Sequence, residues 1–258
     1  MGVRRDVRLA ALAVSGEILN GATGVLERRD LPHDGFCVEP EALAAAFPGR
    51  WNARRALPDP SVGDLVRACA RALRGAGWWN RGEEAQPAIL ALGSDTHYLS
   101  NLVRFTEEVA RSPSAGLSPS RFLFSLPSSV TSLLGILFAL REYQTTITEG
   151  GASGVRAVEH ATDLITTGRA ERALVAAFSA SSARDSRESL AVALCLEAVD
   201  GIPAPTTARL RLPGGCCILS TPIGLTEAGL AHNETMHTSA AGLLLGALAA
   251  GSHFIGRT

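Results

Sequence analysis

The chain has 258 residues, of which 46% are hydrophobic and 19% charged, and its formal net charge is -1 at pH 7. This composition provides ample apolar material for a core and excludes a chain that is disordered throughout. The near-neutral charge argues against a nucleic-acid-binding surface, which needs a clustered basic excess, so we expect no nucleic-acid partner. All 24 basic residues are arginine, which excludes Schiff-base and P-loop lysine chemistry.

The five cysteines are odd in number and form no C-x-x-C pair: Cys37, Cys69, Cys195, Cys216 and Cys217. Adjacent thiols such as the last two make a poor metal clamp. We therefore expect reduced, buried thiols in a cytoplasmic protein in preference to a disulfide or a zinc site, and we expect neither a metal nor another cofactor. The apolar run over residues 238–251 is too short to span a bilayer.

Hydrophobic patterning predicts strands and helices in alternation. Strands are expected over residues 8–15, 88–92, 142–148, 172–178, 190–197 and 216–220. Helices are expected over residues 40–46, 61–75, 100–111, 128–141, 155–167 and 238–250, and loops over 112–120 and 200–213. Ser61 is expected to cap the second of these helices, with Asp64 in its first turn. The alternation predicts an α/β fold with helices on both faces of a sheet.

Residues 145–154 combine a short strand, a tight turn and the start of a helix. A strand–elbow–helix unit of this kind presents a nucleophile at a helix N-terminus. Here the tip of the elbow is Gly150-Gly151, which has no side chain. The sequence therefore predicts the scaffold of a nucleophile site without a nucleophile.

The order of these elements resembles the N-terminal half of a β-ketoacyl-ACP synthase, a family with the thiolase-like fold. The resemblance rests on the motifs within residues 54–78, 89–94, 118–135 and 153–177, and it covers residues 5–200. It implies a mixed, mostly parallel five-stranded sheet with helices on both faces. It also implies a ketosynthase-like N-terminal domain over residues 1–200 and a short C-terminal extension over residues 201–258 that packs on it.

The sequence departs from the family pattern in two places. Counting back from Gly168 puts Gly151 at the position of the family's nucleophilic cysteine, so no residue is assigned to catalysis. The second half of a thiolase-like fold, which carries two histidines, is expected to begin near the end of this chain. His232, His237 and His253 lie in that last region, but none has the family's His-Gly-Thr context.

Within this family, a subunit without the cysteine is of the chain-length-factor type. The resemblance thus implies a non-catalytic subunit that forms a heterodimer with an active ketosynthase in fatty acid, polyketide or aryl-polyene biosynthesis. It further implies an acyl carrier protein with a phosphopantetheine-linked acyl chain as a partner. The strand over residues 142–148 is expected to pair across the dimer axis.

Two residues of the elbow are alternative site candidates. Ser153 lies in a sequence that differs from G-x-S-x-G only at Val155, which permits a serine acyltransferase or hydrolase with Asp163, Asp185 and His232 as possible partners. The same serine is also an ordinary helix-capping residue. Glu149 could assist a decarboxylation near the helix N-terminus, or it could simply favour that terminus electrostatically.

Other side chains admit a functional or a structural interpretation. Arg67, Arg71 and Arg74 follow helical spacing and could dock an acidic carrier protein, or they could be a solvated helix face. His97 follows a strand end and His160 lies within a helix, and structural roles are favoured for both. Trp78-Trp79 are expected to close the core.

Overall fold

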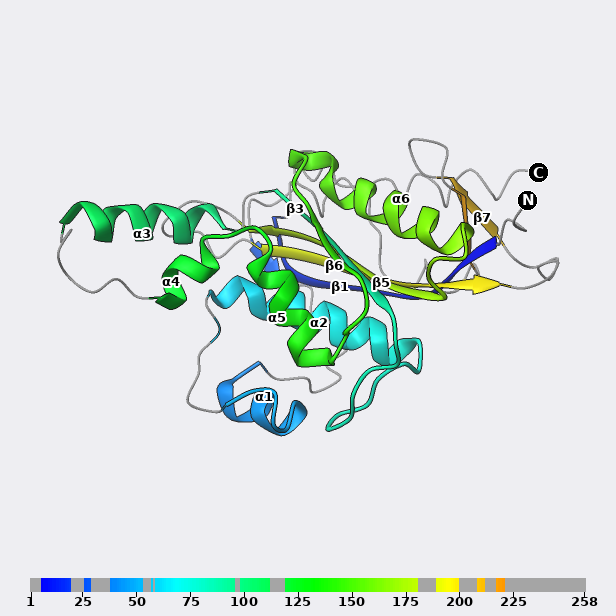
Figure 1. Cartoon of the computed structure of the whole chain (residues 1–258), viewed down its shortest axis with the longest axis horizontal. Coiled ribbons are helices and arrows are strands. Elements are labelled where there is room, and N and C mark those ends of the chain that lie inside the picture. Colours follow the sequence, from blue (N-terminus) through cyan, green and yellow to red (C-terminus); the bar gives the residue numbers. More distant parts are fainter. Residues whose placement is uncertain are drawn as a thin grey trace.

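The computed structural model describes residues 6–19, 26–28, 38–52, 57, 59–95, 98–111, 119–180, 189–199, 208–211 and 217–220 (Figure 1). The strands are β1 Asp6–Leu19, β2 Leu26–Arg28, β3 Ile89–Ser94, β4 Gln144–Ile147, β5 Arg172–Ala180, β6 Ser189–Val199, β7 Ala208–Arg211 and β8 Cys217–Ser220. The helices are α1 Pro40–Ala46, α2 Pro60–Gly75, α3 Leu99–Arg111, α4 Pro119–Phe124, α5 Ser129–Phe138, the 3-10 turn η1 Gly150–Ala152 and α6 Ser153–Thr166.

The strands form one mixed sheet in the order β4-β3-β5-β6-β1-β8-β7, and β2 pairs with β1. The first five strands in this sheet order, from β4 to β1, are the expected five-stranded core. The expectation of a mostly parallel sheet is wrong, because β6 runs antiparallel to both β5 and β1, while β3 is parallel to β4 and β5. Only eight residues separate β5 from β6 in the sequence, too few for the helical crossover that a parallel pair requires.

Helices cover both faces of this sheet, as expected (Figure 1). On one face, α2 and α5 lie against the strands with α1 beyond them, and their side chains join one hydrophobic cluster. On the other face, α6 packs on β3 and β5 and forms a second cluster with them. Every side chain of β3 is buried, which explains its continuous apolar sequence.

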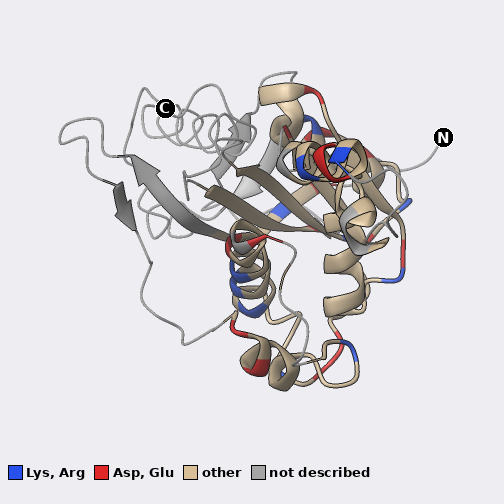
Figure 2. Cartoon of the chain, turned by 90° about the vertical axis from the view of Figure 1, so that its left-hand side faces the viewer, with Lys and Arg blue, Asp and Glu red and all other residues tan. Residues whose placement is uncertain are grey.

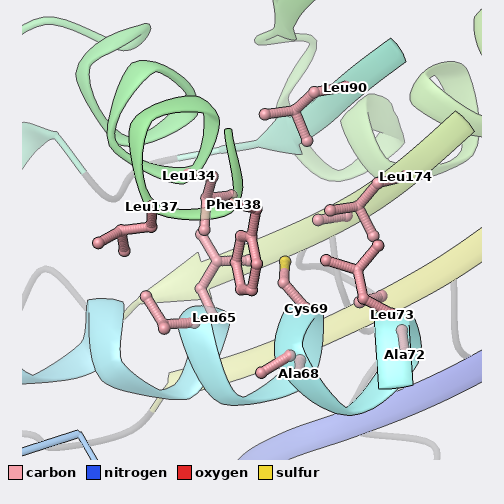
Figure 3. Close-up of a cluster of buried hydrophobic side chains, with 14 of the residues drawn as sticks. Leu65, Ala68, Cys69, Ala72, Leu73, Leu90, Leu134, Leu137, Phe138 and Leu174 are labelled. Atoms are coloured by element: carbon pink, nitrogen blue, oxygen red, sulfur yellow. The ribbon is translucent and has the colours of Figure 1, made fainter. Parts of the chain in front are cut away.

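The larger cluster is built around α2, whose apolar stripe faces both the sheet and α5 (Figure 3). Phe47 stacks on Trp79 with ring centroids 5.3 Å apart, and Phe138 meets both rings edge-on. Trp78 and Trp79 are 4% and 2% exposed, so the expectation that they close the core is confirmed. Such aromatic contacts contribute about 0.5–1.5 kcal/mol each beyond the area that they bury.

The N-cap of α2 differs from the expectation. The capping residue is Asp59, whose carboxylate accepts hydrogen bonds from the backbone N–H of Ser61 at 2.9 Å and from its hydroxyl at 2.6 Å. Ser61 is therefore a donor to the cap and not the cap itself. Pro60 at the first helical position explains the shift, because its fixed φ suits the start of a helix and puts the cap two residues earlier than the pattern indicated.

Two short elements lie where loops were expected. Helix α4 begins at Pro119, within the Ser/Pro-rich segment, and β7 lies within residues 200–213. β8 confirms the strand expected over residues 216–220 and pairs with β1. The helix expected over residues 238–250 lies outside the described residues. Among the helices that the structure describes, none is long and apolar enough to cross a membrane.

Candidate functional site: the elbow before helix α6

The elbow is formed by the end of β4, the turn η1 and the first turn of α6. Gly150 has φ +58°, a left-handed conformation that glycine adopts without a steric penalty. A side chain there would have open space around it. The chain thus reverses at Gly150-Gly151 and enters α6 with its N-terminus directed at the tip of the turn, as the sequence predicted.

Ser153 holds this turn in place. Its side chain is buried, and its hydroxyl accepts a hydrogen bond from the backbone N–H of Glu149 at 2.7 Å. The same hydroxyl donates to the carbonyl of Gly150 at 2.6 Å. Both hydrogen-bonding roles of the hydroxyl are occupied by backbone groups of the elbow, which gives Ser153 a structural role.

Gly93, near the end of β3, is a site residue that the sequence reasoning missed. A Cβ atom at this position would stand 2.6 Å from the backbone nitrogen of Gly154, and it would also overlap the carbonyl of Ser153. The strand can therefore support the base of the elbow only with glycine at this position. The available signal was a glycine within an apolar strand, which indicates close backbone approach.

Glu149 belongs to a small charged group on the surface beside the elbow. Its carboxylate lies 3.4 Å from Nε of Arg156, which also binds Glu159 at 2.7 Å. The hydrogen bond and charge of Glu159, with a smaller effect of Glu149, raise the pKa of Arg156. The carboxylate of Glu149 is thus paired with a cation at the surface, where exposed pairs contribute little to stability.

The described thiols lie away from the elbow. Cys69 of α2 and Cys195 of β6 are buried in the cluster on the opposite face of the sheet from α6. Desolvation by burial raises the pKa of both thiols, so neither can supply a thiolate. Their burial matches the expectation, while the side chains of Cys37, Cys216 and Cys217 are outside the described part of the chain.

Of the histidine and aspartate candidates, the structure describes His160 and Asp163, and neither is hydrogen-bonded to the hydroxyl of Ser153. His160 lies on α6, and its Nε2 is 3.1 Å from the hydroxyl of Tyr143. Asp163 is exposed one turn further along α6. Asp185 and the histidines at positions 97, 232, 237 and 253 lie outside the described residues. Within the described ranges, no cluster of His, Cys, Asp and Glu could hold a metal ion.

The three arginines of α2 do not share an exposed face. Arg67 is half-buried and paired with Asp64, which also accepts a hydrogen bond from Ser189. Arg71 is half-buried as well, and Arg74 is exposed. Figure 2 shows basic and acidic positions interspersed over the described helices. Neither observation supports a basic docking face on α2.

Strand β4, which leads into the elbow, lies at the edge of the sheet. It is held from one side by β3 and from the adjacent helix α5 by a 2.6 Å hydrogen bond between the hydroxyls of Thr131 and Thr146. The carbonyl of Tyr143 accepts from the N–H of Leu90 at 2.9 Å. Because successive peptide groups in a strand alternate in direction, those of Gln144 and Thr146 point away from β3, toward the open edge.

No protein-family model and no curated protein matches the sequence. Among solved structures, the ishigamide ketosynthase/chain length factor matches with a TM-score of 0.55 and 15% identity, over 98% of this chain and 86% of that chain. A ketosynthase in complex with its chain length factor from Xenorhabdus doucetiae matches with a TM-score of 0.48 and 16% identity, over 82% of this chain and 84% of that chain. A beta-ketoacyl synthase from Burkholderia phymatum STM815 matches with a TM-score of 0.49 and 16% identity, over 76% of this chain and 59% of that chain.

The first of these likenesses establishes the fold. The chain has the α/β fold of thiolase-like ketosynthases, as the sequence resemblance predicted, with a mixed sheet and helices on both faces.

Proposed function

We propose that this chain is a ketosynthase-like subunit of the chain-length-factor type, which has no nucleophile of its own and forms a heterodimer with an active β-ketoacyl-ACP synthase. The observation that carries the proposal is the elbow. Its strand, its left-handed turn at Gly150 and its helix are all kept, yet Gly151 stands at the expected nucleophile position. Glycine cannot form the thioester that condensation requires.

The fold supports the same role. The solved structure that matches with a TM-score of 0.55 is described as a ketosynthase/chain length factor, a pairing of the kind proposed here. By the family resemblance, the second partner is an acyl carrier protein with a phosphopantetheine-linked acyl chain, in polyketide, aryl-polyene or fatty acid biosynthesis in the cytoplasm. The subunit would complete the heterodimer and bound the acyl pocket.

The open edge of β4 is the surface that we assign to this pairing. An exposed strand edge carries unpaired N–H and C=O groups and invites a second strand. At Gln144 and Thr146, these groups point outward while their neighbours bind β3. Antiparallel pairing of two such edges would continue the sheet from one subunit into the other.

The test uses the full chain co-expressed with an active β-ketoacyl-ACP synthase from the same organism. Gln144→Pro removes one outward N–H while keeping the bonds to β3, a position where an edge strand tolerates proline. We expect it to abolish co-purification and to leave the isolated chain folded. Gln144→Ala is the control, because it removes the same side-chain hydrogen bond to the carbonyl of Leu140 and keeps the N–H. Equal binding by both variants would contradict pairing through β4.

A second measurement tests the absence of a nucleophile. The purified chain, incubated with acyl carrier protein charged with an acyl chain, is expected to gain no acyl mass, while the ketosynthase partner does. Products are expected only when both subunits are present. Stable acylation of this chain, located to Ser153 or to any cysteine, would contradict the proposal.

A further inference from the structure

Helix α1 ends against the loop that joins α2 to β3 (Figure 1). The N–H of Gly82 in this loop donates to the carbonyl of Ala46, the last residue of α1, at 3.0 Å. Four residues after the end of α1, the guanidinium of Arg50 donates through Nη2 to the carbonyl of Glu83 in the same loop. We call the place where these two contacts join the helix to the loop the α1 corner.

The α1 corner holds more hydrogen-bond donors than its surroundings satisfy. Nε and Nη1 of Arg50 are buried, as is Nε1 of the next residue, Trp51, and none of the three has a hydrogen-bond partner among the residues that the structure describes. Both residues as a whole are only half-buried, so these nitrogens lie directly beneath the surface. Buried donors without an acceptor are rare in proteins, because they lose their hydration without compensation. Such a group calls for an ordered ligand.

The carbonyl acceptors of the corner are already occupied. The carbonyl of Glu83 accepts from Arg50 and also from Nε1 of Trp79, at 3.1 Å. The carbonyl of Phe47 accepts from the backbone N–H groups of both Arg50 and Trp51, each at 3.0 Å. A carbonyl oxygen has two lone pairs, so neither has one left for a third donor. The unmatched N–H groups therefore need an acceptor that these carbonyls cannot supply.

The acidic side chains of the loop do not neutralise Arg50 either. The carboxylate of Glu83 accepts from Nδ2 of Asn80 at 3.3 Å, and Glu84 pairs with Arg141 at 2.6 Å. Within the described ranges, no carboxylate forms an ion pair with Arg50. A water molecule at this place would itself donate hydrogen bonds and need further acceptors, whereas an oxyanion only accepts. Charge and hydrogen bonding thus favour the same kind of ligand.

We propose that the α1 corner binds a small oxyanion, a carboxylate or a phosphate, at the guanidinium of Arg50. Nη2 has two N–H groups and gives one to Glu83, so one edge of the guanidinium still presents two parallel N–H groups to an oxyanion. Trp51, in the same turn, adds an indole N–H. The bound ion fixes the end of α1 to the loop before β3. This site lies outside the elbow and β4, and the inference is independent of the proposed function.

Thermal unfolding of the full chain tests for the ion. The probes are sodium phosphate, sodium acetate and acetamide, the neutral analogue of acetate, at pH 7 and at an ionic strength held constant with sodium chloride. A ligand that binds only the folded protein raises the melting temperature once its concentration exceeds the Kd. We expect at least one of the two anions to raise it and acetamide to leave it unchanged. A response to phosphate alone assigns the site to phosphate, and a response to acetate assigns it to carboxylates. No response to either anion would overturn the proposal.

Two variants locate the response at Arg50. Arg50→Gln removes the charge and the paired N–H groups, so we expect it to need an anion concentration about tenfold higher or more for the same rise in melting temperature. Arg81→Gln, at an exposed position of the same loop, is the matched control and should respond as the wild type does. Phosphate also stabilises proteins because it is excluded from their surface, but this effect acts on all three chains alike. Equal responses of Arg50→Gln and the wild type would overturn the proposal.

A further variant keeps the proposal testable if Arg50→Gln does not fold. Arg50→Lys keeps the positive charge and loses only the planar pair of N–H groups, so it is the milder change. It should still respond to the anion more weakly than the wild type does. A response equal to that of the wild type would contradict binding through the guanidinium.

Discussion

Gly93 and Ser153 lie in direct backbone contact. The Cα atom of Gly93, in β3, lies against the carbonyl group of Ser153, the first residue of α6. The two residues are far apart in the sequence, and this contact fixes the elbow over the sheet. The strand next to β4 thus determines where the N-terminus of α6 stands.

Gly93→Ala should therefore destabilise the protein strongly. Its Cβ would stand 2.6 Å from the nitrogen of Gly154, and backbone atoms cannot move aside as a flexible side chain can. We expect a loss of about 1–3 kcal/mol in the free energy of unfolding, as for other overpacked sites. Urea denaturation measures this loss. Gly75→Ala is the control, because its Cβ would make an ordinary 3.4 Å contact with Ala11 and should be neutral or stabilising. A neutral Gly93→Ala would contradict the close contact.

Ser153→Ala tests the role of the serine in the elbow. It leaves the N–H of Glu149 and the carbonyl of Gly150 without their shared partner. We expect the free energy of unfolding to fall by about 1–3 kcal/mol, measured by thermal or urea unfolding. Ser132→Ala, at an exposed position of α5, should cost much less. A fluorophosphonate probe is expected not to label the wild-type chain. Labelling that disappears in Ser153→Ala would instead establish a serine nucleophile.

A cysteine placed at the tip of the elbow should be reactive. Gly151, unlike Gly150, does not have a positive φ, so Gly151→Cys introduces no left-handed strain. The N-terminus of α6 should lower the pKa of this thiol and speed its alkylation by iodoacetamide at pH 7. The control is Arg169→Cys, an exposed thiol just past the C-terminal end of the same helix, where the dipole has the opposite sign. Peptide mass spectrometry follows each site separately. Equal rates at the two sites would show that the elbow does not activate a thiol.

The buried thiol of Cys69 should make stability fall at high pH. Burial raises its pKa in the folded state far above the value in the unfolded chain. The stability contributed by this difference is complete below the unfolded pKa, about 8.5, and is lost as the pH rises above it toward the folded pKa. The free energy of unfolding of the wild type, relative to that of Cys69→Ala, should therefore fall by about 1.4 kcal/mol per pH unit above the unfolded pKa. Urea unfolding of both proteins between pH 7 and pH 10 measures this difference in free energy. A difference that stays constant with pH would contradict the deep burial of Cys69.

Several elements could be predicted from local sequence alone. The bounds of α1 agree with the expectation, and β3, β5 and α6 agree within two residues at each end. Their patterns are unambiguous because a buried strand is apolar throughout, whereas a helix on a sheet is apolar on one side only. The tip Gly150-Gly151 was predicted for the same reason, since it follows a strand and begins a helix.

The direction of β6 and the role of Ser153 could not be predicted in this way. An apolar strand has the same composition whether its neighbours are parallel or antiparallel, so the antiparallel pairing of β6 with β1 and β5 appeared only in the structure. Likewise, the sequence around Ser153 permits a nucleophile or a structural serine. The choice depends on which groups its hydroxyl meets in three dimensions.

By itself, the sequence determined that this is an α/β chain with a nucleophile elbow and no side chain at the elbow's tip, because these features depend on residue type and on periodicity along the chain. Only the tertiary structure decided that β4 lies at an edge of the described sheet, that Gly93 supports the elbow, and that none of the described side chains of α3 is buried. Each of these depends on which distant segments lie side by side, and local propensity does not encode that.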